Sequence, residues 1–113
     1  AQDLGQTKAI MKLLPVIDTI ERAIANVPAE LADNAWAKGV AGLSKQLDKQ
    51  LKDLGLEKID AKPGTPFNPE LHQAVQFDEA AEGDKEVIAE ELRAGYILNG
   101  AVVRDAMTKV TRQ

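Results

Sequence analysis

The strongest constraint on this chain is a change of apolar period near its middle. Through the first half, large apolar residues recur at alternating spacings of three and four, which is typical of a packed helix seam. Farther along, short β-type runs alternate with turn-forming residues. The stretch AKPGTPFNP at residues 61–69, with three prolines and one glycine, marks a junction. We therefore predict an α+β chain, with helices in residues 1–58 and a small all-β domain in residues 59–113.

The first part predicts two helices. Pro15 interrupts the first seam, because proline lacks a donor and disfavours helical geometry before it, so this helix kinks or ends near Leu14. Asp33 or Asn34 can cap the second helix, and Gly55 is placed to end it. The expected seam residues are Ile10, Leu13, Ile17, Ile20 and Ile24 in the first helix and Val40, Leu43 and Leu47 in the second, with Trp36, Leu51 and Leu54 on the same face.

Two amphipathic helices of this length cannot bury narrow seams completely on each other. We therefore expect a homodimer in which four helices from two chains form a bundle. The alternative is an intrachain helical hairpin packed on the second half. Gly39 lies inside the second helix, where glycine costs about 0.5–1 kcal/mol relative to alanine, so its presence indicates close approach by another surface. Because the chain starts with Ala1 and not Met, we expect a fragment or processed form that lacks an N-terminal part.

Composition limits the classes of function. The 113 residues carry a net charge of −4, and all the excess acid lies in residues 63–113, so no basic face for nucleic acid is visible. Without cysteine there is no disulfide, thiolate zinc site or thiol nucleophile. No apolar run approaches the roughly 20 residues of a membrane span, and no signal peptide is visible.

The one histidine lies in FNPELHQAV at residues 67–75. Asn68 and Pro69 form a helix-start pair, and Phe67 is placed to pack on that first turn, so His72 lies where the turn enters a strand. A general base or a metal ligand is one interpretation of His72. It lacks a nucleophile and an orienting carboxylate at recognisable spacing, and zinc needs at least three protein ligands. We favour a structural imidazole that holds the turn by hydrogen bonds, and we predict neither metal nor cofactor.

The β part carries one strong turn signal and one acidic run. Asn99-Gly100 predicts a type I′ hairpin, because both central residues of that turn need positive φ. The predicted strands are Ala74–Phe77, Val87–Leu92, Tyr96–Leu98 and Ala101–Val103, with the pattern continuing to Val110. The run from Asp78 to Glu91 lacks the alternating spacing of a calcium loop. We interpret it as a solvated hairpin, with an acidic patch facing a basic partner as the alternative.

Several motifs together resemble the GrpE family. FNPELHQAV resembles that family's F-(D/N)-P-x-x-H-x-A segment. GYILNGAVVRDAMTKV, which begins at Gly95 and Tyr96, resembles its closing segment. LLPVIDTIERA at 13–23 is similar to its helix before the bundle, and LGLEKI at 54–59 to its bundle exit. The resemblance covers nearly the whole chain.

GrpE proteins are nucleotide exchange factors for DnaK-type chaperones, so the resemblance implies a non-enzymatic protein of the bacterial cytoplasm, with an organellar matrix less favoured. It implies a homodimer with a long paired helix, a four-helix bundle, and a β-domain that opens the chaperone's nucleotide-binding cleft. The residues that it assigns to the chaperone contact are Leu92 and Val110, with Asn99, Gly100 and Arg104 close to them and Gly39 on the bundle side.

The sequence departs from the family pattern at three positions. Ala101 stands where the family commonly has a basic residue, while Asp105 and Thr108 are also unusual, which bears on the strength of chaperone binding. From the residues alone, Leu92 and Val110 fit ordinary strand core, and Arg104 fits a surface salt bridge. A dimerisation or adaptor module without exchange activity is a second class of function. A small enzyme that uses His72 and a carboxylate is a third.

Overall fold

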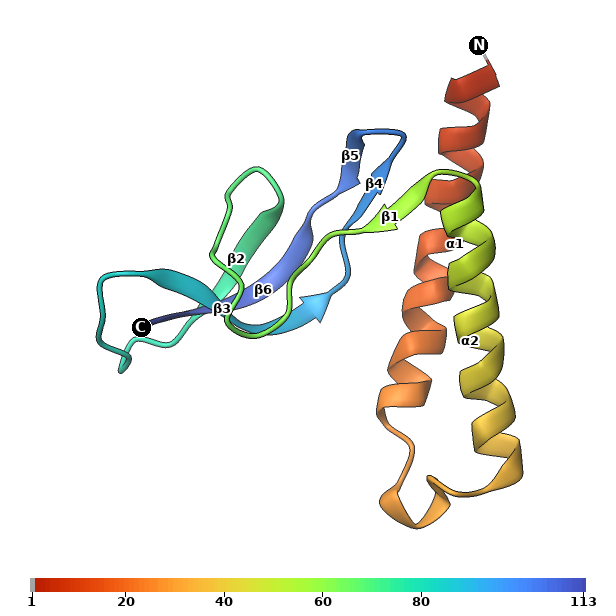
Figure 1. The fold of residues 1–113 in the computed structure, drawn as a ribbon, viewed down its shortest axis with the longest axis horizontal. Coiled ribbons are helices and arrows are strands. Elements are labelled where there is room, and N and C mark those ends of the chain that lie inside the picture. The colour runs from red at the N-terminus through yellow and green to blue at the C-terminus, as the bar shows by residue number, and fades with distance from the viewer. Residues whose placement is uncertain (1) are drawn as a thin grey trace. The chain divides into compact units, whose positions relative to one another are not determined.

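The chain forms two compact units, one helical and one built from strands (Figure 1). The computed structural model describes residues 2–113, with side chains from residue 5 onward. The helical unit ends at Gly55, and the second unit runs from Leu56 to Gln113. The expected division followed residue 58, but Leu56–Lys58 form strand β1, which pairs with β4 of the second unit. Among the described residues, no helix combines the length and apolar character needed to cross a membrane.

Helix α1 runs from Gln2 to Ala25 with Pro15 inside it. Of the two expected outcomes near Leu14, a kink or an end, the helix end is therefore wrong. A helix-interior proline costs about 3 kcal/mol. Ile10, Leu14 and Ile17 lie on either side of it along one face and are all buried. Burying each such side chain contributes about 1.5–3 kcal/mol, which outweighs the cost of the proline. The Thr19 hydroxyl also donates to the carbonyl of Pro15 at 3.0 Å.

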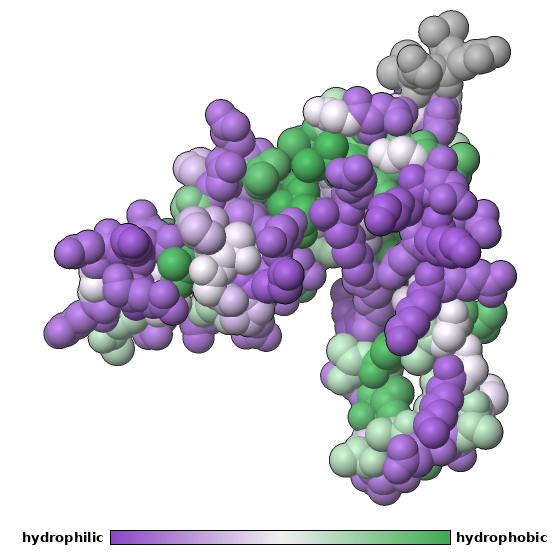
Figure 2. Space-filling view, in the orientation of Figure 1, coloured by the Kyte–Doolittle hydropathy of each residue, from purple (hydrophilic) through white to green (hydrophobic). Residues whose placement is uncertain are grey.

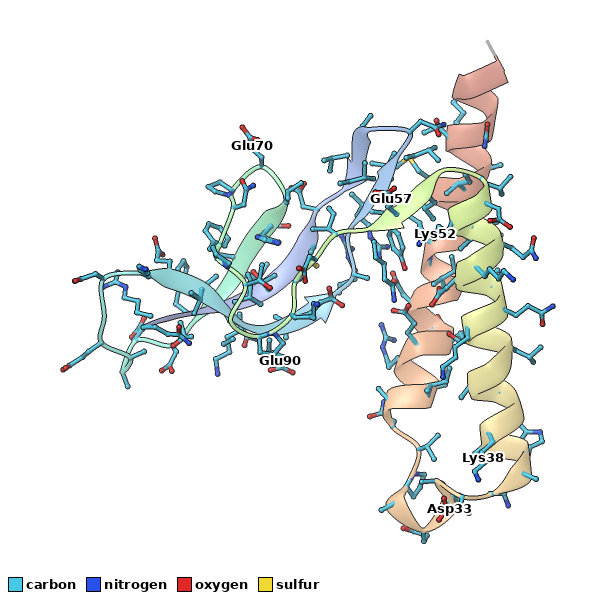
Figure 3. All side chains as sticks on the ribbon, in the orientation of Figure 1. Asp33, Lys38, Lys52, Glu57, Glu70 and Glu90 are labelled. Carbon is cyan, nitrogen blue, oxygen red and sulfur yellow. The ribbon has the colours of Figure 1, made fainter. Side chains whose placement is uncertain are left out.

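Helix α2 spans Ala35–Asp53 and has both of the ends that the sequence predicts. The Asn34 side chain accepts hydrogen bonds from the backbone N–H groups of Trp36 and Ala37, which satisfies two donors of the first turn. Gly55 follows the helix with φ of 95°, a conformation that glycine adopts without strain. A short 3-10 turn, η1 (Ala29–Leu31), lies between the two helices. Figure 3 labels Asp33 in this connection and Lys38 early in α2.

Each helix carries a wider apolar face than the hairpin buries. On α1, the predicted seam residue Leu13 is exposed, and its neighbour Leu14 is buried instead. Successive residues of a helix are about 100° apart around its axis. Leu13 and Val16 therefore lie on a stripe roughly 90° around α1 from the stripe of buried residues. On α2, Leu51 is buried, whereas Leu43 is 65% exposed and Trp36 is 77% exposed. Figure 2 shows apolar surface on the helical unit between hydrophilic side chains.

The second unit contains two three-stranded sheets. The hairpin sheet has the order β1-β4-β5, with β4 at Tyr96–Leu98 and β5 at Ala101–Arg104, and all its pairs are antiparallel. The mixed sheet has the order β2-β6-β3, formed by β2 (His72–Phe77), β6 (Ala106–Arg112) and β3 (Glu86–Arg93). Within it β2 runs parallel to β6, and β3 runs antiparallel. The predicted strands are thus confirmed, with shifts of one or two residues at their ends.

The junction stretch at 61–69 packs along the mixed sheet. Backbone hydrogen bonds join Gly64 and Thr65 to Ile88, and Phe67 to Glu86, so this segment covers the outer edge of β3. Covering an edge removes a template for pairing with other chains. A small core of Ile59, Ala61 and Ala106, with Leu71 and Ile97 packed against it, holds the two sheets together.

Candidate functional site

His72 is the first residue of β2 and is buried. Its Nδ1 accepts a hydrogen bond from the backbone N–H of Asn68 at 2.9 Å, and its Nε2 lies 2.8 Å from the carbonyl oxygen of Asp60. A carbonyl can only accept, so Nε2 carries the proton and the imidazole is neutral. Both nitrogens are therefore engaged by backbone groups, which leaves no lone pair for a metal or for proton abstraction. Across the described residues, no group of three or more metal-ligating side chains comes together.

The turn before His72 uses Asn68, and the chain then enters a strand at His72, as the sequence predicts. The Asn68 side chain accepts from the N–H of Glu70, and its carbonyl accepts from the N–H groups of Leu71 and His72. One turn forms and the chain enters β2 directly. The Phe67 ring lies 6.0 Å from the imidazole, centroid to centroid. Figure 3 shows Glu70 at the outer end of this turn.

The β4–β5 connection is the predicted tight turn. Asn99 has φ of 51° and Gly100 has φ of 89°, so both central residues are left-handed, as a type I′ turn requires. Both residues are exposed, and nothing lies within 4 Å of the position where a Cβ of Gly100 would stand. Ala101 is exposed beside the turn, so the departure from a basic residue removes a charge from an accessible position.

Leu92 is presented by an irregularity of β3. Glu91 pairs with Thr108 and Arg93 pairs with Met107, so Leu92 is an extra residue without a register partner. Such bulges bend a strand and re-aim side chains, and they occur often beside functional sites. Leu92 is 40% exposed, which makes it accessible to a partner. Nearby, Glu90 projects from β3 toward solvent in Figure 3.

The structure buries Val110, the second residue that the resemblance assigns to the chaperone contact. This residue is in the middle of the mixed sheet, paired with Phe77 on one side and Ile88 on the other, and only 1% of it is exposed. Its side chain therefore belongs to the core of the mixed sheet. Phe77, the register partner of Val110 at the end of β2, is 58% exposed.

The other predicted contact residues lie in different surroundings. Arg104 is half-buried, and its Nε donates a hydrogen bond to the carbonyl of Ala94 at 3.0 Å. Its guanidinium is therefore held against the strand unit and does not extend into solvent. Gly39 is on an exposed part of α2, and among the described residues nothing beyond its own stretch of helix lies within 4 Å of its Cβ position. The structure does not bring Gly39 into the strand unit, which holds all the other predicted contact residues.

Two further positions that depart from the family pattern fit their surroundings. Thr108 is fully buried in β6, and its hydroxyl donates to the carbonyl of Gln73 in β2 at 3.0 Å. The hydroxyl is therefore satisfied, which removes the cost that an unpaired buried polar group would carry. Asp105 is the single residue between β5 and β6, and it is exposed.

Comparison with known proteins decides the family. The GrpE family model matches residues 1–112, so it extends across both units. This chain belongs to the GrpE family. It is 38% identical over 108 residues to Protein GrpE of Lachnoclostridium phytofermentans, a match that covers 96% of this chain and 48% of that protein. It is 42% identical over 101 residues to Protein GrpE of Halalkalibacterium halodurans, with coverage of 89% and 52%. Protein GrpE of Synechococcus elongatus is 42% identical over 103 residues, with coverage of 90% and 49%. The chain thus spans about half the length of these relatives.

Proposed function

We propose that this GrpE-family chain acts as an adenyl-nucleotide exchange factor. In this role it binds the nucleotide-binding domain of a DnaK-type chaperone, opens the nucleotide cleft and speeds ADP release. The observation that carries the proposal is the family match, because it extends over both the helical and the strand unit. The bacterial relatives favour the cytoplasm as the place of action.

The proposed mechanism is thermodynamic linkage and involves no covalent step. A protein opens a cleft only if it binds the open chaperone more tightly than the closed, ADP-bound chaperone. Accelerating release about a thousandfold means lowering the barrier by roughly 4 kcal/mol. A flexible strand unit would deform on contact, and the binding energy would then not be available to open the chaperone's cleft. The tight Asn99-Gly100 turn and the covered edge of β3 favour a stiff strand unit that transmits this energy.

We assign the chaperone contact to the strand unit, centred on Leu92. The bulge of β3 presents this side chain outward, and it is the accessible member of the two contact residues that the family resemblance implies. Fully burying a leucine contributes about 1.5–3 kcal/mol, which is a sizeable part of the binding energy needed. The exposed turn at Asn99-Gly100 supplies backbone groups without bulky side chains, which suits insertion into a narrow cleft.

We further propose that the helical unit forms a homodimeric four-helix bundle. A helix in a four-helix bundle contacts two neighbours, so it needs an apolar face wider than a single seam. Both helices meet that requirement, since Leu13 and Val16 on α1 and Trp36 and Leu43 on α2 lie outside the stripe that the hairpin buries. A second chain would cover these side chains. Gly39, in open space on α2, would then be available to the chaperone or to the partner chain.

The proposal is tested by the affinity of this chain for two states of a bacterial DnaK-type chaperone, nucleotide-free and ADP-bound, using isothermal titration calorimetry. We expect clearly tighter binding to the nucleotide-free state. Leu92→Asp should weaken binding, because it places a charge in an apolar contact. Val75→Asp is the matched control, since Val75 is also an extra residue in its strand and is 41% exposed. A folded dimer that binds neither state would refute the proposal and favour an adaptor module.

A further inference from the structure

The chain passes three times between the two sheets of the strand unit, and the last two crossings meet at one junction. It leaves the mixed sheet through Ala94 and Gly95, between β3 and β4, and returns through Asp105, between β5 and β6. Leu92 lies just before the first of these two crossings, and the Asn99-Gly100 turn lies beyond it in the other sheet. The geometry of this junction therefore fixes where the turn stands relative to Leu92.

Arg104 spans the two crossings. It is the last residue of β5, and its register partner in β4 is Tyr96. Both Nε and Nη2 of the guanidinium donate to the carbonyl oxygen of Ala94, on the first crossing. The guanidinium carbon also lies 5.3 Å from the centroid of the Tyr96 ring, within the range of a cation–π contact. Ala94 and Tyr96 are both buried, so the Arg104 guanidinium contacts residues that the surrounding packing holds in place.

The backbone at the junction is packed too closely for any side chain but hydrogen at Gly95. A Cβ there would overlap the backbone of Asp105 and Ala106, so the two crossings are in direct contact. The carbonyl of Gly95 accepts a hydrogen bond from the N–H of Ile59 at 3.0 Å, which brings a third segment to the same point. The Arg104 side chain adds its hydrogen bonds to these backbone contacts and joins β5 to the first crossing.

We propose that Arg104 is a positioning residue for nucleotide exchange, which locks the hairpin sheet to the mixed sheet, and that it does not itself bind the chaperone. This inference rests on the proposed exchange function. If the two sheets must push on the chaperone as one rigid body, a loose junction lets Leu92 bind while the hairpin sheet yields. Loss of the lock then lowers the maximal rate of ADP release more than it lowers the affinity. Loss of a direct contact with the chaperone instead lowers the affinity more than the maximal rate of ADP release.

The test uses Arg104→Lys, with Arg112→Lys as the matched control at the exposed end of β6. Lysine keeps the charge and much of the stem but cannot form the planar two-nitrogen contact or stack as a guanidinium does. ADP release from a DnaK-type chaperone is measured against increasing concentrations of each variant. We expect Arg104→Lys to lower the maximal rate about fivefold or more, a change of the size typical of a lost coupling. The half-saturating concentration of Arg104→Lys should stay within about twofold of the value for the unchanged protein. This is expected if the substitution weakens the coupling to ADP release and leaves the contact with the chaperone in place.

A second readout uses the free protein. Amide hydrogen exchange at Ile59, and the ring resonances of Tyr96, the only tyrosine, should change in Arg104→Lys and not in Arg112→Lys. Unchanged exchange and resonances in Arg104→Lys would overturn the lock. A raised half-saturating concentration with an unchanged maximal rate would instead make Arg104 a contact residue. If the unchanged protein and Arg112→Lys both fail to accelerate release, the proposed function itself fails, and the positioning role fails with it.

Discussion

Replacing His72 by alanine should destabilise the strand unit without removing any chemical step. The substitution leaves the N–H of Asn68 and the carbonyl of Asp60 without their imidazole partners. Each unsatisfied buried group costs about 1–3 kcal/mol. Asp60 is an exposed residue, so its carbonyl can regain water, and the Asn68 N–H alone then accounts for an expected loss of about 1–3 kcal/mol. A unit of this size has only about 3–9 kcal/mol of stability, so much of it would disappear.

Urea unfolding followed through the ring resonances of Tyr96 measures this loss, because Tyr96 is buried in the strand unit and is the only tyrosine. His72→Asn keeps an acceptor near the position of Nδ1, and His72→Gln keeps a donor that reaches toward the position of Nε2. Each should recover part of the loss, since each can satisfy one of the two backbone groups. A His72→Ala protein that unfolds at the same urea concentration as the unchanged protein would refute the hydrogen-bonding role.

Three further outcomes follow from particular contacts. Asn34→Ala should lower the stability of the helical unit by about 1 kcal/mol, measured by thermal unfolding, because two N–H groups lose their cap. Leu43→Asp should shift sedimentation equilibrium toward the monomer, while Lys45→Asp, at an exposed position roughly 200° around the helix from Leu43, should leave it unchanged. Equal behaviour of the two variants would count against the proposed bundle. Gly100→Val should cost roughly 1–2 kcal/mol in urea unfolding, because φ of 89° is strained for a β-branched residue, and an unchanged midpoint would contradict the turn assignment.

Features set by a few neighbouring residues could be predicted from the sequence. The cap at Asn34, the helix stop at Gly55 and the Asn99-Gly100 turn each depend on the local conformation that one residue type favours. The same holds for the turn around Asn68, which the sequence predicts as one tight turn that leads into a strand, as the structure shows.

Features set by distant parts of the chain were beyond local patterns. Pro15 stays inside α1 because the burial of apolar side chains along one face outweighs the cost of a proline in a helix. A local pattern shows that cost but not the burial. The burial of Val110 depends on its position between two other strands, which periodicity along one strand does not reveal. Arg104 looked like a surface charge because its acceptor, the carbonyl of Ala94, is a backbone group from another strand connection. Backbone acceptors leave no mark in the sequence.

The rate at which a DnaK-type chaperone releases fluorescent ADP tests the central claim most directly. The rate is measured for the chaperone alone, with this chain, with Leu92→Asp and with Val75→Asp, after each sample is shown to be folded. We predict a large acceleration by the unchanged chain and by Val75→Asp, and a strongly reduced one by Leu92→Asp. An unaltered release rate in the presence of a folded dimer would contradict the account. Equal acceleration by all three proteins would place the contact away from Leu92.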